Sequence, residues 1–279
     1  MNIIRILFAV VALIVSTACE RDSVIDVGQE KTTPIMTAYF YRDSSLLVNV
    51  YSSVSFYSSA YYQPLTDAYI SIIRNGIYEQ KVAVDSGAMS VTFDNISVKA
   101  DDSIRVEVTS VEGQMSASTQ VLQPVNFTVT ASLRDSIVDC NASVVDGNVA
   151  TDYFQFQVFA DDSLVDCYYY DDIFEATFAT SDQLLGLFTD SDFNGRLRYV
   201  RFAFNINDTK RSDGKNATIR VRLYHHTYDY YQYLSSIQGA FVNTVLPILG
   251  QSYCYTNVNG GYGIVSGMSY TEQEIDPLE

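Results

Sequence analysis

The sequence predicts an all-β protein: an N-terminal immunoglobulin-like β-sandwich followed by a second β-rich domain that carries one short helix. From Pro34 onward, short runs of alternating apolar and polar residues are separated by turn residues, which is the pattern of strands with one buried face. The chain holds 22 tyrosines and 15 phenylalanines but only 5 prolines, a composition that favours strands over disorder. Only the segment near 228–243 places apolar residues at convincing helical spacing.

The first residues have the features of an export signal. Residues 1–5 carry one positive charge, residues 6–15 form an uninterrupted apolar run, and three small residues precede Cys19. A ten-residue run is about 15 Å long as a helix, too short for a hydrocarbon core of about 30 Å. The segment resembles the bacterial lipobox pattern, so we predict a lipoprotein signal peptide (1–18), cleavage before Cys19 and lipid on its thiol. An ordinary secretory signal with an incidental cysteine is the alternative.

Residues 19–32 are then a lipidated N-terminus and linker. The acidic residues just after Cys19, Glu20 and Asp22, resemble the surface-export signal of some Bacteroidetes lipoproteins. We therefore expect an outer-membrane protein, held to the membrane through lipid on Cys19, with its body surface-exposed rather than facing the periplasm. With 17 basic and 33 acidic residues the net charge is −16, which disfavours nucleic acid as a partner because phosphate binding relies on Lys and Arg.

The first predicted domain, residues 33–123, contains one strong hairpin signal. Asn75-Gly76 separates the runs 67–74 and 77–84, and Asn-Gly between two strands favours a type I′ turn. Further strands are predicted at 35–41, 46–51, 104–109 and 114–122, the last two joined by a turn at Glu112-Gly113. Pro124 supplies no ladder donor, so the domain boundary is placed at Gln123-Pro124.

The second predicted domain, residues 124–279, resumes the strand pattern and then gives the helix. Strands are expected at 137–145, 153–160, 197–206 and 217–224, with a turn at Asp146-Gly147 and a polar loop over 208–216. In the predicted helix 228–243, spacings of three and four place five apolar residues on one face: Tyr230, Tyr233, Leu234, Ile237 and Phe241. The later glycines at 260, 261, 263 and 267 predict a strand with close backbone approach.

Several segments, taken in order, resemble a known family. They are 34–40 (PIMTAYF), 64–70 (PLTDAYI) followed by Asn75-Gly76, 191–195 (SDFNG), 221–223 (VRL), 228–234 (YDYYQYL) and 255–267 (YTNVNGGYGIVSG). They are similar to uncharacterised Bacteroidetes envelope lipoproteins that are catalogued as a domain of unknown function and often encoded beside TonB-dependent receptors. The resemblance implies an accessory to nutrient uptake whose partner is such a receptor or another envelope protein. It supplies no catalytic residues.

One stretch resembles half of a calcium loop. Asp190, Asp192, Asn194 and Gly195 match the alternate oxygen ligands and the glycine of such a loop, but Arg201 stands where the bidentate Glu is required. A solvated turn explains the same residues. We expect no bound cofactor, and calcium is the only one for which the sequence offers a candidate site. His225 and His226 lie side by side, and strand geometry directs them to opposite faces rather than to one metal.

The tyrosines are the strongest candidates for binding. Tyr57, Tyr61 and Tyr62 in one loop, and the clusters 168–170 and 228–233, offer flat amphipathic platforms for a peptide, glycan or protein. Burial of alternate strand residues in the core is the competing interpretation. Among the cysteines, Cys140 and Cys167 allow a disulfide, while the alternative treats these two and Cys254 as small buried hydrophobes.

The predicted function is a non-catalytic envelope lipoprotein that binds or scaffolds as an accessory to outer-membrane nutrient uptake. The sequence contains no Gly-x-Ser-x-Gly nucleophile motif. Two alternatives stay open. One is a surface glycan- or peptide-binding, adhesin-like module, and the other is a hydrolase of surface polymers that would require two carboxylates facing each other across a cleft.

Overall fold

The computed structural model describes residues 32–54, 62–145, 150–170, 186–191, 193, 195–211, 217–245 and 254–277, with side chains of the helix described as far as 237. Residues Thr32–Glu279 form one unit. The strands are β1 (Pro34–Tyr41), β2 (Leu46–Ser53), β3 (Tyr62–Gln63), β4 (Tyr69–Arg74), β5 (Ile77–Ala83), β6 (Ser90–Phe93), β7 (Ser103–Ser110), β8 (Gly113–Gln120), β9 (Phe127–Arg134), β10 (Ile137–Val145), β11 (Tyr153–Ala160), β12 (Ser163–Val165), β13 (Cys167–Tyr169), β14 (Leu187–Thr189), β15 (Leu197–Asn205), β16 (Ile219–His226) and β17 (Tyr262–Ile275). The helices are the 3-10 helix η1 (Ile206–Thr209) and the α-helix α2 (Tyr228–Val245).

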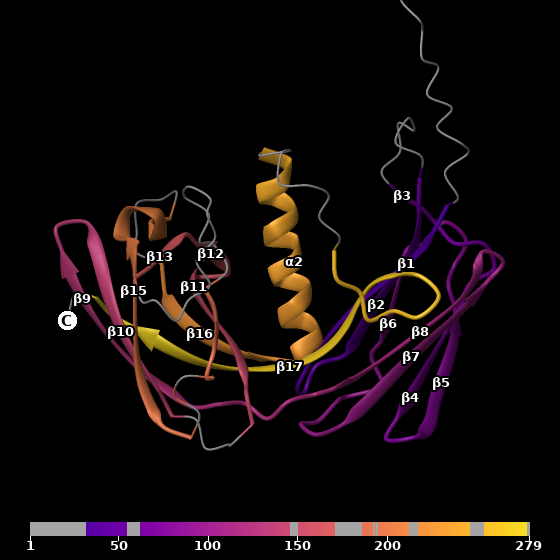
Figure 1. The fold of residues 1–279 in the computed structure, drawn as a ribbon, viewed down its shortest axis with the longest axis horizontal. Coiled ribbons are helices and arrows are strands. Elements are labelled where there is room, and N and C mark those ends of the chain that lie inside the picture. The colour runs from indigo at the N-terminus through magenta and orange to yellow at the C-terminus, as the bar shows by residue number, and fades with distance from the viewer. Residues whose placement is uncertain are drawn as a thin grey trace, which may run out of the picture. The chain divides into compact units, whose positions relative to one another are not determined.

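The strands of the described ranges form one large central sheet and two four-stranded sheets (Figure 1). The central sheet has the order β12-β11-β16-β17-β1-β2-β3, with β14 paired to β11 and β6 paired to β2. The smaller sheets have the orders β5-β4-β7-β8 and β13-β15-β10-β9. All these pairings are antiparallel except that of β1 with β17, which is parallel. The prediction of an all-β, sandwich-type fold is confirmed.

Alternation along the strands builds two hydrophobic cores from the described residues. In β1 the even-numbered residues Met36, Ala38 and Phe40 are fully buried, whereas their odd-numbered neighbours are only partly buried. The first core joins β1, β2 and β6 to the β5-β4-β7-β8 sheet. The second joins β11 and β16 to the β13-β15-β10-β9 sheet. Each core is therefore a sandwich between one smaller sheet and one end of the central sheet.

The long strand β17 links the two cores. It pairs with β1 on one side and with β16 on the other, and it supplies Val265 to the first core and Ile275 to the second. The expected boundary at Gln123-Pro124 separates most residues of the two cores. However, Val258 and Val265, which lie far beyond it in the sequence, belong to the first core, so residues 33–123 do not complete a sandwich alone.

The predicted glycine-rich strand is part of β17, and close backbone approach explains two of its glycines. At Gly263, with φ of 116°, an added Cβ would lie 2.0 Å from the carbonyl oxygen of Met36 in β1. At Gly267 an added Cβ would lie 2.4 Å from the carbonyl oxygen of Gln120. A side chain at either position would collide with the neighbouring backbone. This prediction is confirmed, although the sequence indicated neither the length of β17 nor its parallel partner.

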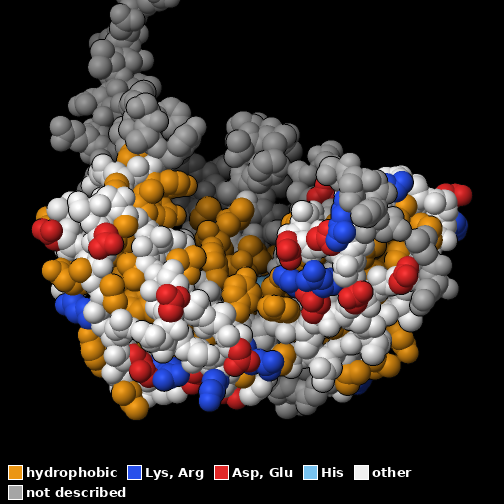
Figure 2. Space-filling model, turned by 180° about the vertical axis from the view of Figure 1, so that it is seen from behind, with side chains coloured by type: hydrophobic (Ala, Val, Ile, Leu, Met, Phe, Trp, Pro, Cys, Tyr) orange, Lys and Arg blue, Asp and Glu red, His pale blue; other side chains and the backbone are white. Residues whose placement is uncertain are grey.

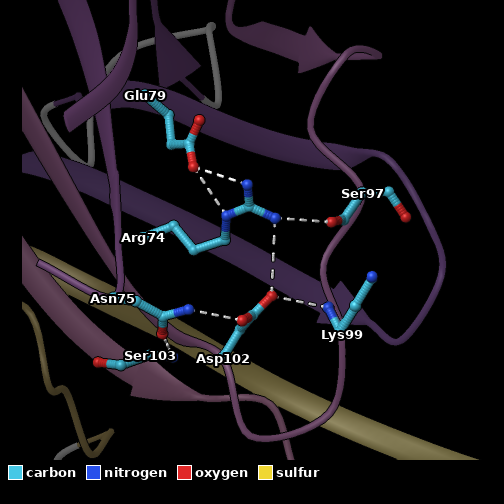
Figure 3. A network of polar contacts seen from close by, with 7 residues as sticks. All are labelled: Arg74, Asn75, Glu79, Ser97, Lys99, Asp102 and Ser103. Carbon is cyan, nitrogen blue, oxygen red and sulfur yellow. Dashed lines mark hydrogen bonds and ion pairs between the residues drawn. The ribbon is translucent and has the colours of Figure 1, made fainter. Parts of the chain in front are cut away.

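The predicted β4–β5 hairpin is confirmed, and a polar network fixes it to the loop before β7 (Figure 3). Asn75 and Gly76 have φ of 53° and 77°, as a type I′ turn requires. The Arg74 Nε donates to Glu79 at 2.8 Å, while the Asp102 carboxylate accepts hydrogen bonds from the side chain of Asn75 and the backbone of Lys99, both at 2.8 Å. Partial burial raises the pKa of Asp102, but these hydrogen bonds and nearby Arg74 outweigh it and leave the pKa below its usual value.

The predicted helix is α2, which lies over the middle of β17 in Figure 1 and contacts both β17 and β11. It begins after Thr227, whose hydroxyl accepts from the backbone of Tyr230 as an N-cap. Its most buried described residue is Tyr231, which the predicted face omitted, whereas Ile237 is exposed. The predicted face is therefore right at Tyr230, whose ring contacts those of Tyr39 and His226, and wrong at Ile237. No helix in the described ranges is both long and apolar enough to cross a membrane.

Candidate functional site

The face of the central sheet opposite the two cores is rich in tyrosine. Because Met36, Ala38 and Phe40 point into a core, alternation turns Tyr39 and Tyr41 to the other face. The ring of Tyr41 lies 6.5 Å from that of Tyr224 and 6.1 Å from that of Tyr270, and Tyr39 contacts Tyr230 of α2 at 5.5 Å. Figure 2 shows hydrophobic side chains, a class that includes tyrosine, gathered across the middle of one face of the molecule.

A cavity of about 340 Å³ opens where this face meets α2. We call it the tyrosine pocket, and its described lining is Ile35, Thr37, Tyr51, Tyr233, Cys254, Tyr255, Thr256, Tyr262 and Gly263. Its volume is within the range of about 300–1,000 Å³ of small-ligand sites. Aromatic faces and a few hydroxyl groups form its walls, which is the mixture that binds and orients an amphipathic ligand.

One wall of the tyrosine pocket is the segment before β17, and hydrogen bonds to α2 and β17 hold it in place. The backbone N–H of Tyr255 donates to Ser236 Oγ at 2.8 Å, and its hydroxyl donates to Asp229 Oδ1 at 2.5 Å. The Asn257 side chain donates to Asp229 Oδ2 at 3.3 Å and to the Val265 carbonyl at 2.8 Å. The pocket is therefore formed before any ligand arrives, which reduces the entropic cost of binding.

Three phenol groups of the pocket, those of Tyr51, Tyr233 and Tyr255, have a raised pKa and are neutral at physiological pH. The hydrogen bond to Asp229, followed by burial, raises the pKa of Tyr255 to about 12. Burial, followed by the neighbouring tyrosines, raises the pKa of Tyr51. Burial also raises the pKa of Tyr233, although a hydrogen bond with Tyr39 lowers it. Neutral phenols both donate and accept hydrogen bonds, so the pocket selects polar groups rather than a charge.

Of the predicted loop tyrosines, Tyr62 lies beside the pocket. It belongs to the edge strand β3 and is 54% exposed, and its ring centroid lies 4.5 Å from that of Tyr51. Tyr57 and Tyr61 lie outside the described residues. Within the predicted cluster 228–233, Tyr233 lines the pocket, whereas Tyr231 packs on Tyr153 at 4.8 Å.

Sequence reasoning did not single out Tyr51, Tyr255 or Tyr262 as pocket residues. Tyr51 lies in β2, whereas Tyr255 and Tyr262 lie about 200 positions later, just before and at the start of β17, and the parallel pairing of β1 with β17 brings the two regions together. The only available signal was the 255–267 segment used for the family resemblance.

Asp190, the first residue of the predicted calcium loop, anchors a turn. Its side chain is fully buried, and its Oδ1 accepts from the backbone N–H of Asp152 at 2.7 Å. Its carbonyl accepts from Phe193 at 2.8 Å. Asp192 and Asn194 lie outside the described residues, and the described ranges contain no group of three His, Cys, Asp or Glu side chains that could hold a metal.

The two histidines at the end of β16 occupy different environments. His225 Nδ1 lies 2.8 Å from the Gln123 carbonyl and its Nε2 lies 3.3 Å from the Asp152 carboxylate. His226 is 1% exposed, and its Nε2 lies 3.0 Å from Gln155 Oε1. Burial, followed by neighbouring His225, lowers the pKa of His226 to about 3. His226 is thus a neutral residue packed beneath α2, where its ring contacts that of Tyr230 at 4.8 Å.

The three cysteines among the described residues, Cys140, Cys167 and Cys254, are free thiols. Cys140 and Cys167 are buried in the second core, and burial raises the pKa of Cys140 to about 12 and that of Cys167 further. The disulfide allowed by the sequence is therefore not formed, and these two residues act as small core hydrophobes. Cys254 is exposed and lines the tyrosine pocket, so the alternative that counted it among the small buried hydrophobes was wrong for this residue.

Comparisons with known proteins identify the family and add distant structural neighbours. No curated protein matches the chain. A two-domain fibronectin type-III segment from chicken tenascin is 8% identical over 69% of this chain and 90% of its own, with a TM-score of 0.23. A DUF3823 family protein from Parabacteroides merdae is 9% identical, over 70% of this chain and 90% of its own, with a TM-score of 0.22. A chitinase from Bacillus thuringiensis is 11% identical, over 64% of this chain and 28% of its own, with a TM-score of 0.21. Residues 20–274 match the family described as Domain of unknown function (DUF4249), and the chain belongs to this family.

Proposed function

We propose that the protein is a non-catalytic, lipid-anchored protein of the bacterial outer membrane that captures a ligand in the tyrosine pocket. In this proposal it serves as an accessory to a nutrient-uptake system. The observation that carries the binding function is the preformed pocket of about 340 Å³ with aromatic walls. The described residues that line it offer hydroxyls, aromatic faces and a thiol rather than carboxylates, which supports binding over hydrolysis.

The location rests on the leader. An apolar run followed by small residues and Cys19 is the arrangement that a lipoprotein signal peptidase cleaves. The acidic residues that follow favour surface exposure in a Bacteroidetes envelope. Mass spectrometry of the protein from its native membrane should find a mature chain that begins with diacylated Cys19. An intact leader or an unmodified Cys19 would contradict the anchor.

The uptake role follows from the resemblance to lipoproteins encoded beside TonB-dependent receptors. We expect such a receptor to co-purify with the protein in mild detergent. A pull-down that recovers the intact protein without any envelope partner would contradict this part of the proposal.

The ligand class is a surface glycan or a peptide. Tyrosine rings bury flat apolar faces while their hydroxyls bond to polar groups, and both ligand types present this combination. The competing view of the protein as an adhesin-like module uses the same pocket, so it differs in biological role rather than in chemistry.

Two tyrosines of equal exposure provide the binding test. Tyr262 lines the tyrosine pocket and Tyr78 lies on β5, and both are 57% exposed. The wild type is first screened on a glycan array and a peptide library to find ligands that it binds. We expect Tyr262→Ala to lose binding to these ligands and Tyr78→Ala to bind them as the wild type does. Ligands bound equally well by Tyr262→Ala would exclude the pocket as the site.

A further inference from the structure

The threonine hydroxyls of the tyrosine pocket have protons left to donate. The Thr37 hydroxyl accepts from the side-chain amide of Asn49 at 3.3 Å, and the Thr256 hydroxyl accepts from the backbone N–H of Val258 at 3.1 Å. An amide N–H can only donate, so each hydroxyl is the acceptor in its bond and still carries its own proton. Both threonines line the pocket, which therefore offers these protons to a ligand.

The tyrosines of the pocket add further donors, with one exception. The Tyr255 hydroxyl already donates to Asp229. Burial raises the pKa of both Tyr39 and Tyr233, and the hydrogen bond between them raises that of Tyr39 further but lowers that of Tyr233. Tyr39 is thus the donor in this bond, and Tyr233 keeps its proton for the pocket. Tyr262, which is 57% exposed, presents its hydroxyl to solvent and to an incoming ligand.

This supply of donors determines which ligand groups the pocket satisfies. The described lining residues include no charged and no amide side chain, and bonds from Asn49, Val258 and Tyr39 already use lone pairs of three of the hydroxyls. A sugar hydroxyl donates as well as accepts, so a glycan brings protons for which the pocket has few acceptors. Burying a polar group without a partner lowers affinity. The pocket therefore favours a ligand that accepts hydrogen bonds without donating them.

Proline residues have this combination of properties. They have no backbone N–H, while their carbonyl groups are acceptors. In the polyproline II conformation the backbone makes no internal hydrogen bonds, so every carbonyl is open to an outside donor. The pyrrolidine rings are apolar, and grooves lined by aromatic rings bind them in several protein families. Here Tyr51, Tyr233, Tyr255 and Tyr262 supply the aromatic walls.

Both sides of such a complex are ordered before they meet. The hydrogen bonds of Tyr255 and Asn257 fix one wall of the pocket, and a polyproline II segment is stiff in solution, which lowers the entropic cost of association. A cavity of about 340 Å³ is small, so it accepts a short segment. We propose that the tyrosine pocket binds a short proline-rich oligopeptide in the polyproline II conformation. This inference rests on the proposed binding function and narrows its ligand class to one kind of peptide.

The first test compares three uncharged ligands. Calorimetry on the full chain in detergent would use an end-blocked proline decamer, a glycine-serine decamer of equal length and cellohexaose as a neutral glycan. We expect the proline decamer to bind at least about tenfold more tightly than either of the others, because only it combines stiff geometry, apolar rings and acceptors without donors. Absence of binding of the proline decamer, or equal binding of either comparison ligand, would overturn the proposal.

Variants then locate the binding site and test the role of the donors. Tyr262→Phe removes one hydroxyl and keeps the ring, so it should weaken binding of the proline decamer by about threefold to tenfold, and Tyr262→Ala should weaken it further. The matched control is Tyr78→Phe, at a residue of equal exposure on β5, which should leave binding unchanged. An unchanged thermal midpoint shows that each variant is folded. If both variants of Tyr262 bind the decamer like the wild type, the decamer does not occupy the pocket and the proposal is wrong.

The same variants separate this inference from the proposed function. Suppose that the proline decamer does not bind, whereas another ligand found in the glycan and peptide screen is lost in Tyr262→Ala. The pocket is then a binding site for a different class of ligand, and only the present inference fails. If binding of no ligand depends on Tyr262, the proposed function of the pocket fails as well.

Discussion

Acidification should destabilise the protein through His226. This imidazole is 1% exposed, and burial together with neighbouring His225 lowers its pKa to about 3. In the unfolded chain the pKa of a histidine is about 6.5. Below pH 6.5 the unfolded state therefore takes up a proton that the folded state refuses. The contribution of His226 to stability is complete above pH 6.5 and is lost progressively as the pH falls towards 3.

The size of the effect follows from this difference in pKa. Each pH unit between the two values changes the free energy of unfolding by about 1.4 kcal/mol. At pH 5 the expected loss relative to neutral pH is about 2 kcal/mol, and at pH 3, where the folded-state imidazole is itself half protonated, it is about 4 kcal/mol. Because domains of this kind are stable by only about 5–15 kcal/mol, the loss at pH 5 is easily measured.

The assay is urea unfolding of the wild type and of His226→Gln at pH 7.5, 6 and 5. The glutamine is neutral at every pH and can still donate to Gln155. We expect the variant to lose about 2 kcal/mol less than the wild type between pH 7.5 and 5. The His226 ring should also show no NMR titration between pH 7.5 and 4.5. Equal acid sensitivity of both proteins, or a titration midpoint above pH 6, would refute the reasoning.

Two further predictions concern packing. Gly263→Ala should lower the free energy of unfolding by about 3 kcal/mol or more, because its Cβ would meet the backbone of the paired strand. The control is Gly87→Ala, which has a positive φ but open space around it and should lower the free energy of unfolding by about 1–2 kcal/mol. Similar losses for the two variants in urea unfolding would contradict the close contact at Gly263. Of the thiols beyond residue 19, only one should react with a thiol reagent in the folded protein, because burial protects the other two. The reactive thiol is Cys254, and the protected ones are Cys140 and Cys167.

Elements encoded by local signals were predictable from the sequence. Asn75-Gly76 determines the type I′ turn through its own backbone preferences, and β1 and β2 alternate because one face of each is buried more deeply than the other. The helix was predicted because Tyr230, Tyr233 and Leu234 recur at helical spacing. Its buried face was predicted only in part, with Tyr231 omitted and Ile237 included, because that face depends on how the helix contacts the sheet.

Features that depend on distant segments were not predictable. Residues 264–269 of β17 are all buried, because the small sheets cover one face and α2 the other, so the strand shows no alternation. The tyrosine pocket combines Tyr51, Tyr233 and Tyr262, and only the long-range pairing of β1 with β17 brings them together. By contrast, Tyr62 stood out because it belonged to a local cluster of tyrosines.

The parallel pairing of β1 with β17 has a consequence for how the protein reaches its native state. Ile35 and Tyr262 are sheet partners although 227 positions separate them. A polypeptide that has emerged only as far as α2 would leave β1 and β16 as open edges, which readily pair with other chains. Completion of both sandwiches must await residues 262–275, and such non-local closure is slow. We therefore expect the protein to depend on protection from aggregation until that strand docks.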